Sequence, residues 1–347
     1  MYDIYGTRSM QSYILIEGDY IMSSIKDVAK RAKVGSATVS RVINNTGYVS
    51  EETREKILKA IEELNYTPNE LARNLFKKKA GIIAIIVPNI AHPFFCEFVK
   101  CAEEELFKAG YKVMLCNTAE KENVEHEFLE MLERHIVDGI ITDVHTLDVE
   151  EYKHIDKPIV ALDRYLGKNI PVVSVDHAEG GRLAAEELLR NGCKKVLHFR
   201  GAEMFEAPFL ERHREFDRVM EENSVDVVSF EIEWNQFDDS YFKKAIGSIF
   251  ENGFDYDGIF GGDLPAIECV NECLRRNIKI PEEVKIVAYD GTYVTNLVEP
   301  KVTSIVQPIN ELAKETVRIL LNMQNGKVTT EKHTKLHVTF KKGRTTQ

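Results

Sequence analysis

The stretch from Ser23 to Lys79 constrains the fold of this 347-residue chain most strongly, because it predicts three short helices in close succession. Ser24 and Asp27 form a capping-box pattern at the start of the first helix. Its apolar residues recur at helical spacing: Ile25, Val28, Ala29 and Ala32. A break at residues 33–35 precedes a second helix at 36–44, and a third follows at 51–65. Two short helices joined by a tight turn and braced by a third predict a helix-turn-helix DNA-binding module.

The charge distribution favours the same interpretation. Residues 23–79 contain twelve Lys or Arg and seven Asp or Glu, a net charge of +5, whereas the whole chain carries −11 and the remainder therefore −16. A basic segment on an acidic chain localises the attraction for phosphate, which supplies most non-specific DNA affinity. The alternative is a three-helix module with a solvated surface that binds protein or nothing at all.

Several motifs together resemble the LacI/GalR family of bacterial repressors. The first are DVAKRAKVGSATVSRVINNTGYVSEETREKI and LNYTPNELARNL, and the likeness continues through VPNIAHPFF, VDGII, LDR, GGDLPA, YDGT and TSIVQP. The resemblance therefore covers nearly everything from about residue 23 onwards. Residues 1–22 do not share it; they predict a loose arm or an over-extended start, with no signal-peptide pattern.

The resemblance implies a set of DNA-contacting residues. Ser36 and Ala37 occupy positions used for base choice, and Arg41 is the strongest candidate for a bidentate guanine contact. The remaining positions are expected mainly to position phosphates: Ser24, Lys26, Thr38, Ser40, Asn44, Ser50, Thr53, Tyr66 and Asn69. Lys33 replaces the glycine that is common in the turn.

Residues 69–80 are expected to form a hinge after the DNA-binding domain at 23–68. Pro68 ends the third helix, and the following helix, 69–76, is too short to be stable alone. In the family, two such helices meet in the minor groove, where Leu75 matches an apolar side chain that is inserted between base steps.

From Gly81 the pattern changes to short apolar runs that alternate with longer amphipathic segments. The runs GIIAIIV, YKVMLC, DGIIT, PIVAL, VVSV, KVLHF, DGIF and VKIVAYD predict buried parallel strands. Helices are expected near 96–109, 122–135, 177–191, 211–223, 239–252, 264–277 and 309–324. This alternation predicts a doubly wound α/β fold. The family divides such a region into two lobes that resemble a periplasmic binding protein: 81–175 with 308–328, and 176–306 with 329–347.

Polar side chains follow several of these strands, where ligands bind in open α/β sheets. They are Asn89, His92, Asp143, Asp163, Arg164, Asp263, Asp290 and Gln307, with Phe94, Phe95 and Phe237 beside them. Carboxylates and amides that bond hydroxyls, together with rings that stack on a sugar face, suit a neutral sugar. Hydrogen bonds of this kind to charged groups contribute about 1.5–3 kcal/mol each.

The resemblance implies the roles of individual residues at that cleft. Asp163 and Arg164 match a pair that forms hydrogen bonds with sugar hydroxyls, and Arg212 matches an arginine that contacts the sugar ring or a hydroxyl. Phe237, or else Trp234, matches a stacking aromatic. Asp290 and Gln307 match further hydroxyl partners, and His92 stands where an Asn is usual, next to the matching Phe94 and Phe95. Gly262-Asp263 replaces the usual Asn-Asp, so Asp263 is kept in the set but one amide contact is missing.

Other motifs favour structural explanations. Gly180-Gly181 predicts close packing of a strand and a helix rather than a phosphate cradle. Cys269 and Cys273 are four residues apart, but no third metal ligand is evident, so neither a metal nor a cofactor is expected. Asp163 and Asp290 could be imagined as a glycosidase pair, although such an activity joined to a DNA-binding module has little support. The six cysteines and the absence of a signal peptide predict a cytoplasmic protein with no membrane partner.

The sequence therefore predicts a homodimeric repressor of a carbohydrate-utilisation operon, not an enzyme, that binds double-stranded operator DNA. The resemblance, which is nearest to sucrose and ribose operon regulators, implies that the effector is sucrose, ribose or a phosphorylated form, bound between the lobes and weakening DNA binding. Three alternatives remain: a catabolite regulator whose co-effector is a phosphorylated carrier protein, a purine- or nucleoside-responsive repressor, and a solute receptor or sugar enzyme. The missing leucine-heptad tail favours a dimer over a tetramer.

Overall fold

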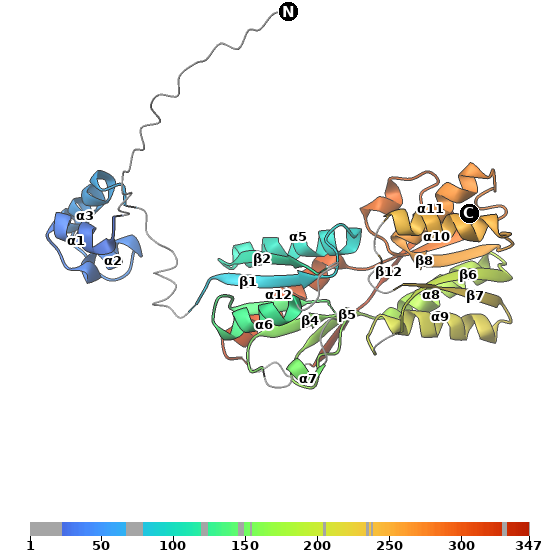
Figure 1. The fold of residues 1–347 in the computed structure, drawn as a ribbon, viewed down its shortest axis with the longest axis horizontal. Helices are drawn as coiled ribbons and strands as arrows, with labels where there is room; N and C mark the ends of the chain where they lie inside the picture. The colour runs from blue at the N-terminus through green and yellow to red at the C-terminus, as the bar shows by residue number, and fades with distance from the viewer. Residues whose placement is uncertain are drawn as a thin grey trace, which may run out of the picture. The chain divides into compact units, whose positions relative to one another are not determined.

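The computed structural model describes residues 23–66, 79–118, 124–144, 149–152, 155–203, 206–233, 236, 239–327 and 332–346. The chain divides into two compact units, with the boundary at Lys77 and Lys78. We call the first unit the head and the second the body; Figure 1 shows both. In the part of the chain that is described, no helix is long and apolar enough to cross a membrane.

The head consists of α1 (Ile25–Ala32), α2 (Ser36–Ile43) and α3 (Glu51–Glu63), as predicted. The capping box is present, because the Asp27 amide donates to the Ser24 hydroxyl oxygen and the Ser24 amide donates to the Asp27 carboxylate. A small core holds the three helices together, formed by Val28, Ala29, Ala32, Val39, Val42, Ile57 and Ala60. Lys33 ends α1 in the left-handed conformation, with φ 57°. That position suits glycine better.

The body is built on two six-stranded sheets, each the core of one lobe. The first sheet contains, in spatial order, β11 (His333–Leu336), β5 (Val172–Val175), β4 (Ile159–Leu162), β3 (Gly139–Thr142), β1 (Ile82–Val87) and β2 (Lys112–Asn117). The second contains β12 (Thr339–Lys341), β10 (Thr303–Val306), β9 (Lys285–Asp290), β8 (Gly258–Gly262), β6 (Lys195–Gly201) and β7 (Asp226–Ile232). All pairs are parallel except β10 with β12.

Helices cover both sheets, and every helix longer than four residues in the body was predicted. The first lobe contains α5 (Pro93–Lys108), α6 (Val124–Glu133), α7 (Val149–Tyr152) and α12 (Ile309–Gln324); the second contains α8 (His177–Arg190), α9 (Leu210–Glu222), α10 (Asp239–Glu251), α11 (Asp263–Arg275) and the short η1 (Tyr293–Asn296). The buried strand residues pack against these helices in three large clusters. The predicted doubly wound α/β fold is thus confirmed.

The chain passes between the lobes three times. It enters the second lobe after β5, and returns after β10 so that α12 packs against α5 in the first lobe. The predicted assignment of all residues from 329 to 347 to the second lobe is wrong for β11, which pairs with β5 in the first sheet. Only after β11 does the chain cross again and place β12 beside β10.

Close packing explains the pair Gly180-Gly181 on α8. A Cβ atom on Gly181 would lie 2.1 Å from the Arg212 carbonyl oxygen of α9, and one on Gly180 would lie 2.7 Å from the Tyr289 ring. Helices α8 and α9 therefore touch through their backbones, as the prediction of tight packing required. Cys269 and Cys273 lie buried on α11 in the apolar core of the second lobe.

Candidate functional site

Helix α2 presents a polar surface whose residues all lie on the side away from the core of the head. Ser36, Ala37 and Arg41 are exposed, while Val39 and Val42 of the same helix are buried. Among residues 23–66, none forms an ion pair with Arg41. Its guanidinium is therefore available to bond a base edge or a phosphate.

The other residues expected to contact DNA differ in exposure. Ser24, Lys26 and Ser50 are exposed, and Thr38, Ser40, Asn44, Thr53 and Tyr66 are half-buried. Five of them take part in local hydrogen bonds: the Asn44 amide donates to the Ser40 carbonyl at 2.8 Å, the Ser50 hydroxyl donates to Thr53 at 2.8 Å, and the Ser24 hydroxyl donates to Asp27 at 2.6 Å. Asn69 and Leu75 lie outside the described residues. DNA contact by any of these residues stays a prediction.

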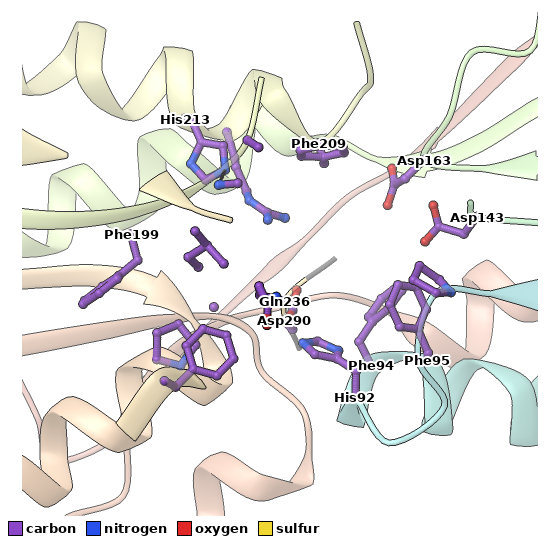
Figure 2. Close-up of a pocket in the computed structure, with 18 of the residues that line it drawn as sticks. His92, Phe94, Phe95, Asp143, Asp163, Phe199, Phe209, His213, Gln236 and Asp290 are labelled. Atoms are coloured by element: carbon purple, nitrogen blue, oxygen red, sulfur yellow. Dashed lines mark hydrogen bonds between the residues drawn. The ribbon is translucent and has the colours of Figure 1, made fainter. Parts of the chain in front are cut away.

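A cavity of about 210 Å³ lies in the body, at the carboxyl ends of strands from both sheets (Figure 2). The first lobe supplies residues after β1, β3 and β4, and the second supplies residues at the ends of β6, β7, β8, β9 and β10. Parallel strands direct their carboxyl ends to one edge of a sheet, which is why residues far apart in sequence meet here.

Seven of the residues expected at the cleft line this cavity: His92, Phe94, Phe95, Asp163, Arg212, Asp290 and Gln307. The strand and helix ends position them, since Asp163 directly follows β4, Asp290 ends β9, and His92 occupies the N-cap position of α5. Phe237, like its alternative Trp234, lies outside the described residues. Ligand contact by the seven stays a prediction, and the structure supplies the common cavity.

Asp163 joins the cavity to a buried chain of hydrogen bonds that links the two lobes. Its Oδ1 atom lies 2.8 Å from Nε2 of His177 on α8, and His177 Nδ1 lies 2.9 Å from the hydroxyl of Tyr289 on β9. The three side chains are all buried. A carboxylate accepts from Nε2–H, so Nδ1 then accepts the Tyr289 proton and the tautomer of His177 is fixed.

Asp143 faces Asp163 across the first-lobe side of the cavity (Figure 2). Loss of water around it raises the pKa of Asp143 well above its ordinary value, and the nearby Asp163 raises it further. Two carboxyl groups this close cannot both ionise readily. Asp143 can therefore act as a neutral acid that donates a hydrogen bond.

Asp290 and Gln307 form the corresponding pair on the second-lobe side. The Gln307 Nε2 atom donates to Asp290 Oδ1 at 2.8 Å, which fixes the orientation of the amide because a carboxylate only accepts. Gln307 is 5% exposed, and its Oε1 atom is buried without a hydrogen-bond partner. Such an atom costs free energy until a donor reaches it.

Among the lining residues that the structure describes, Arg212 supplies the one guanidinium. Its Cζ atom lies 4.5 Å from the centroid of the Tyr289 ring and 5.8 Å from that of Phe209, so both rings support it through cation–π contacts. Next to it, His213 belongs to a second chain, in which Asp217 bonds His198 at 2.9 Å and His198 bonds His213 at 2.9 Å. Burial lowers the pKa of His198 and, more strongly, of His213, where Arg212 adds to the effect.

The expectation that Arg164 and Asp263 contact ligand is not met by the geometry, since neither lines the cavity. Arg164 is buried and its Nη1 atom donates to the Glu125 carboxylate at 2.6 Å, so its charge is neutralised inside the first lobe. The Asp263 carboxylate accepts from the amides of Gly291 and Thr292, at 3.1 and 2.7 Å. It therefore shapes the turn after β9 that carries Asp290.

Several lining residues were not singled out from the sequence: Pro88, Phe199, Gly201, Ala202, Phe209, His213, Ile232, Glu233, Gln236, Phe242, Gly262 and Pro265. Asp143, which also lines the cavity, was noted as a polar residue after a strand but was given no role. Asp143 follows a buried strand, and this signal is visible in the sequence. Phe199, Phe242 and His213 face the cavity only because of how their elements pack. Nothing in their local sequence separates them from ordinary core residues.

Two parts of the chain match known protein families. Residues 24–69 match the bacterial regulatory proteins of the lacI family, and residues 172–346 match a periplasmic binding protein-like domain. These are the segments that contain the head helices and the second lobe.

Individual relatives agree with these matches over most of their length. The ribose operon repressor of Halalkalibacterium halodurans is 38% identical, over 86% of this chain and 90% of the relative. The sucrose operon repressor of Streptococcus mutans is 40% identical, over 87% and 92%. A solved structure of a periplasmic binding protein/LacI transcriptional regulator from Alkaliphilus metalliredigens, complexed with D-xylulofuranose, covers 77% of this chain and 99% of its own, with 30% identity and a TM-score of 0.68. The chain belongs to the LacI family of bacterial regulatory proteins.

Proposed function

We propose that this protein is a homodimeric repressor that binds operator DNA of a carbohydrate-utilisation operon and is released by a sugar. The observation that carries the proposal is the joining of two features in one chain. One is the exposed polar surface of α2, and the other is the cavity at the carboxyl ends of both sheets.

The names of the relatives support the carbohydrate assignment. Relatives at 36–40% identity are ribose and sucrose operon repressors, and the neighbour from Alkaliphilus metalliredigens was solved with D-xylulofuranose. The lining of this cavity fits such ligands, because its carboxylates, amide and guanidinium can bond hydroxyls while its phenylalanine rings can cover an apolar sugar face.

The mechanism follows from where the cavity lies. A ligand that bonds Asp163 from the first lobe and Asp290 from the second is held by both sheets at once. It also touches Asp163, the first member of the Asp163–His177–Tyr289 chain that links the lobes. Such a ligand favours one arrangement of the lobes over another. A sugar with different affinities for the two arrangements shifts their populations and so alters the affinity for DNA.

The DNA-binding part is tested by selecting a duplex from a random library with the full chain and measuring its affinity by fluorescence anisotropy. We expect a near-palindromic site, since two heads of a dimer read two half-sites. Replacing Arg41→Ala should weaken binding by about 10- to 100-fold, the loss of one bidentate base contact of roughly 1–3 kcal/mol.

Lys56→Ala is the matched control, because Lys56 is an exposed base on α3 that already pairs with Glu52 at 2.7 Å. It should change affinity by only a few-fold. Failure to select any sequence, or equal effects of the two variants, would contradict the proposed role of α2. Tighter DNA binding on addition of a phosphorylated carrier protein, without a response to sugar, would favour a catabolite regulator instead. A response to purines alone would favour a nucleoside-responsive repressor.

A further inference from the structure

Negatively charged side chains outnumber positively charged ones in the described lining of the cavity. Asp163, Asp290 and Glu233 contribute carboxylates, whereas Arg212 is the one Lys or Arg among the lining residues that the structure describes. The two histidines of the lining add no compensating charge. Burial lowers the pKa of His92 and of His213, so both are neutral at pH 7.

Three helix N-termini add positive potential at the cavity: those of α9 and α11, whose N-cap residues Phe209 and Gly262 line it, and that of α5. A helix N-terminus is equivalent to roughly half a positive charge. Pro93 at the first position of α5 has no amide N–H, and the side chains of Phe94 and Phe95 occupy the cavity wall beside it. Together with Arg212 these N-termini come to about 2.5 positive charges. The carboxylates of Asp163, Asp290 and Glu233 exceed this, so the described lining carries a small net negative charge.

The hydrogen-bonding groups point to the same kind of ligand. The Gln307 amide nitrogen donates to Asp290, and the buried Oε1 atom of the same side chain has no hydrogen-bond partner. His177 occupies one oxygen of Asp163, and Gln307 occupies one oxygen of Asp290, so the second oxygen of each can accept from a ligand. These three side chains offer acceptors, whereas Asp143 and Arg212 offer donors, so the lining suits hydroxyl groups, which can both donate and accept.

We infer that the cavity takes an uncharged polyhydroxy ligand, a free sugar, and rejects its phosphorylated form. Hydroxyl groups donate to Asp163, Asp290 and Gln307 and accept from Arg212. A phosphate ester brings two negative charges and only acceptor oxygens, so it meets the carboxylates with repulsion and leaves the Gln307 acceptor unsatisfied. This inference rests on the proposed function, because it names the chemical class of the effector at that site.

The test is calorimetry of the full chain with matched pairs: D-ribose and D-ribose 5-phosphate, sucrose and sucrose 6-phosphate, and D-fructose and D-fructose 6-phosphate. For the pair whose free sugar binds, we expect the phosphate to bind at least 100-fold more weakly. An equal or higher affinity for the phosphate would overturn the inference. If that phosphate also lowered the affinity for DNA, the proposed sugar-responsive repressor would stand. If neither form of any sugar bound, both proposals would fall.

Variants of single carboxylates test whether charge sets this selectivity. Asp290→Asn keeps the shape and should narrow the affinity ratio between phosphate and free sugar by about tenfold, corresponding to 1.4 kcal/mol. Glu233→Gln should narrow the ratio less, because Glu233 is exposed at the rim. Glu231→Gln is the matched control, since this exposed carboxylate of β7 lies two residues away and outside the lining. It should leave the ratio unchanged. Equal ratios in all three variants would contradict an electrostatic origin of the selectivity.

Discussion

The head and the body place their functional residues in opposite environments. In the head, Ser36, Ala37 and Arg41 project from one short helix into solvent, and seven small apolar residues form the core beneath it. In the body, Asp163, Asp290 and Gln307 come from three different strand ends and are nearly buried.

This difference implies different consequences of mutation. A change on the surface of α2 can abolish recognition without loss of stability, because no packing depends on it. A polar group in the cavity is coupled to buried partners, so changing it alters binding and stability together. The head is therefore a replaceable surface on a stable support, whereas the cavity is part of the core of the body.

The largest effect is expected where the backbones of the body touch. Gly181→Ala would place a Cβ atom 2.1 Å from the Arg212 carbonyl, which forces α8 and α9 apart and displaces Arg212. We expect a loss of about 3 kcal/mol or more in the free energy of unfolding of the body. Gly247→Ala on α10 is the control: its nearest neighbour would be 3.8 Å away, and the body should gain about 0.5–1 kcal/mol. Urea denaturation measures both, and a stable Gly181→Ala variant would contradict the packing.

Lowering the pH from 7.5 to 5.5 should reduce the stability of the body but not that of the head. Burial lowers the folded-state pKa of His92, His198 and His213 below 6.5, so the unfolded chain binds more protons below that pH. The contribution of these histidines to the free energy of unfolding is complete above pH 6.5. It decreases as the pH drops, by up to about 1.4 kcal/mol per histidine per pH unit. The exposed His337, whose pKa Glu179 raises, opposes this weakly. Asp143 and Asp263 oppose it too, because burial raises the pKa of each carboxyl and the folded body therefore binds their protons more readily than the unfolded chain does. The expected fall in stability is the excess of the histidine effect over theirs.

The head should not respond over the same range. Residues 23–79 contain no histidine, and the pKa of Asp27 is lowered, chiefly by the hydrogen bond from Ser24, so its contribution is lost only below pH 4. Hydrogen exchange of the intact chain at pH 7.5, 6.5 and 5.5, corrected for intrinsic rates, measures each region separately. Protection should fall in the body alone, and a parallel loss in the head would contradict this account.

Asp163→Asn should separate sugar response from DNA binding. It removes the charge that faces the cavity while its amide oxygen can still accept from His177. We expect a 10- to 100-fold loss of sugar affinity, equivalent to the roughly 1.5–3 kcal/mol of a charged hydrogen bond, with operator affinity in the absence of sugar preserved. Calorimetry and anisotropy measure the two quantities. Loss of operator affinity without loss of sugar affinity would contradict the assignment of Asp163 to sugar binding.

The smallest effect concerns the turn between α1 and α2. Lys33 adopts φ 57°, a conformation that costs a residue with a side chain about 1 kcal/mol relative to glycine. Lys33→Gly should therefore raise the stability of the head by about that amount, visible as slower hydrogen exchange in residues 25–63 alone. Faster exchange would show that the lysine side chain contributes more than the backbone loses.

The sequence allowed prediction of those elements whose burial is repetitive. Strands β1, β3, β4, β5, β6, β8 and β9 and the long helices have buried apolar runs or stripes, so local patterns were sufficient. Strand β7 was missed because it is an edge strand with exposed Asp226 and Glu231, and lacks a continuous apolar run. Strands β11 and β12 are short and are defined only by pairing with β5 and β10, which no local pattern encodes.

From the strand pattern, cavity residues were predictable where a strand end carries a polar residue, whereas Arg212 on helix α9 was expected only from the family resemblance. Asp163, Asp290 and Gln307 met that rule. Arg164 also met it, but its side chain turns toward Glu125, a partner 39 residues earlier that the sequence does not reveal. His213 and Phe242 failed the rule and still line the cavity, because helix packing and not strand direction brings them there.

The most direct test of the central claim is the operator affinity of the full chain, by anisotropy on the selected duplex, with and without a saturating free sugar. We predict that at least one of ribose, sucrose or fructose raises the dissociation constant tenfold or more, and that operator DNA weakens binding of that sugar by the same factor. Calorimetry that shows the sugar bound, together with an unchanged operator affinity, would contradict the coupling between cavity and head.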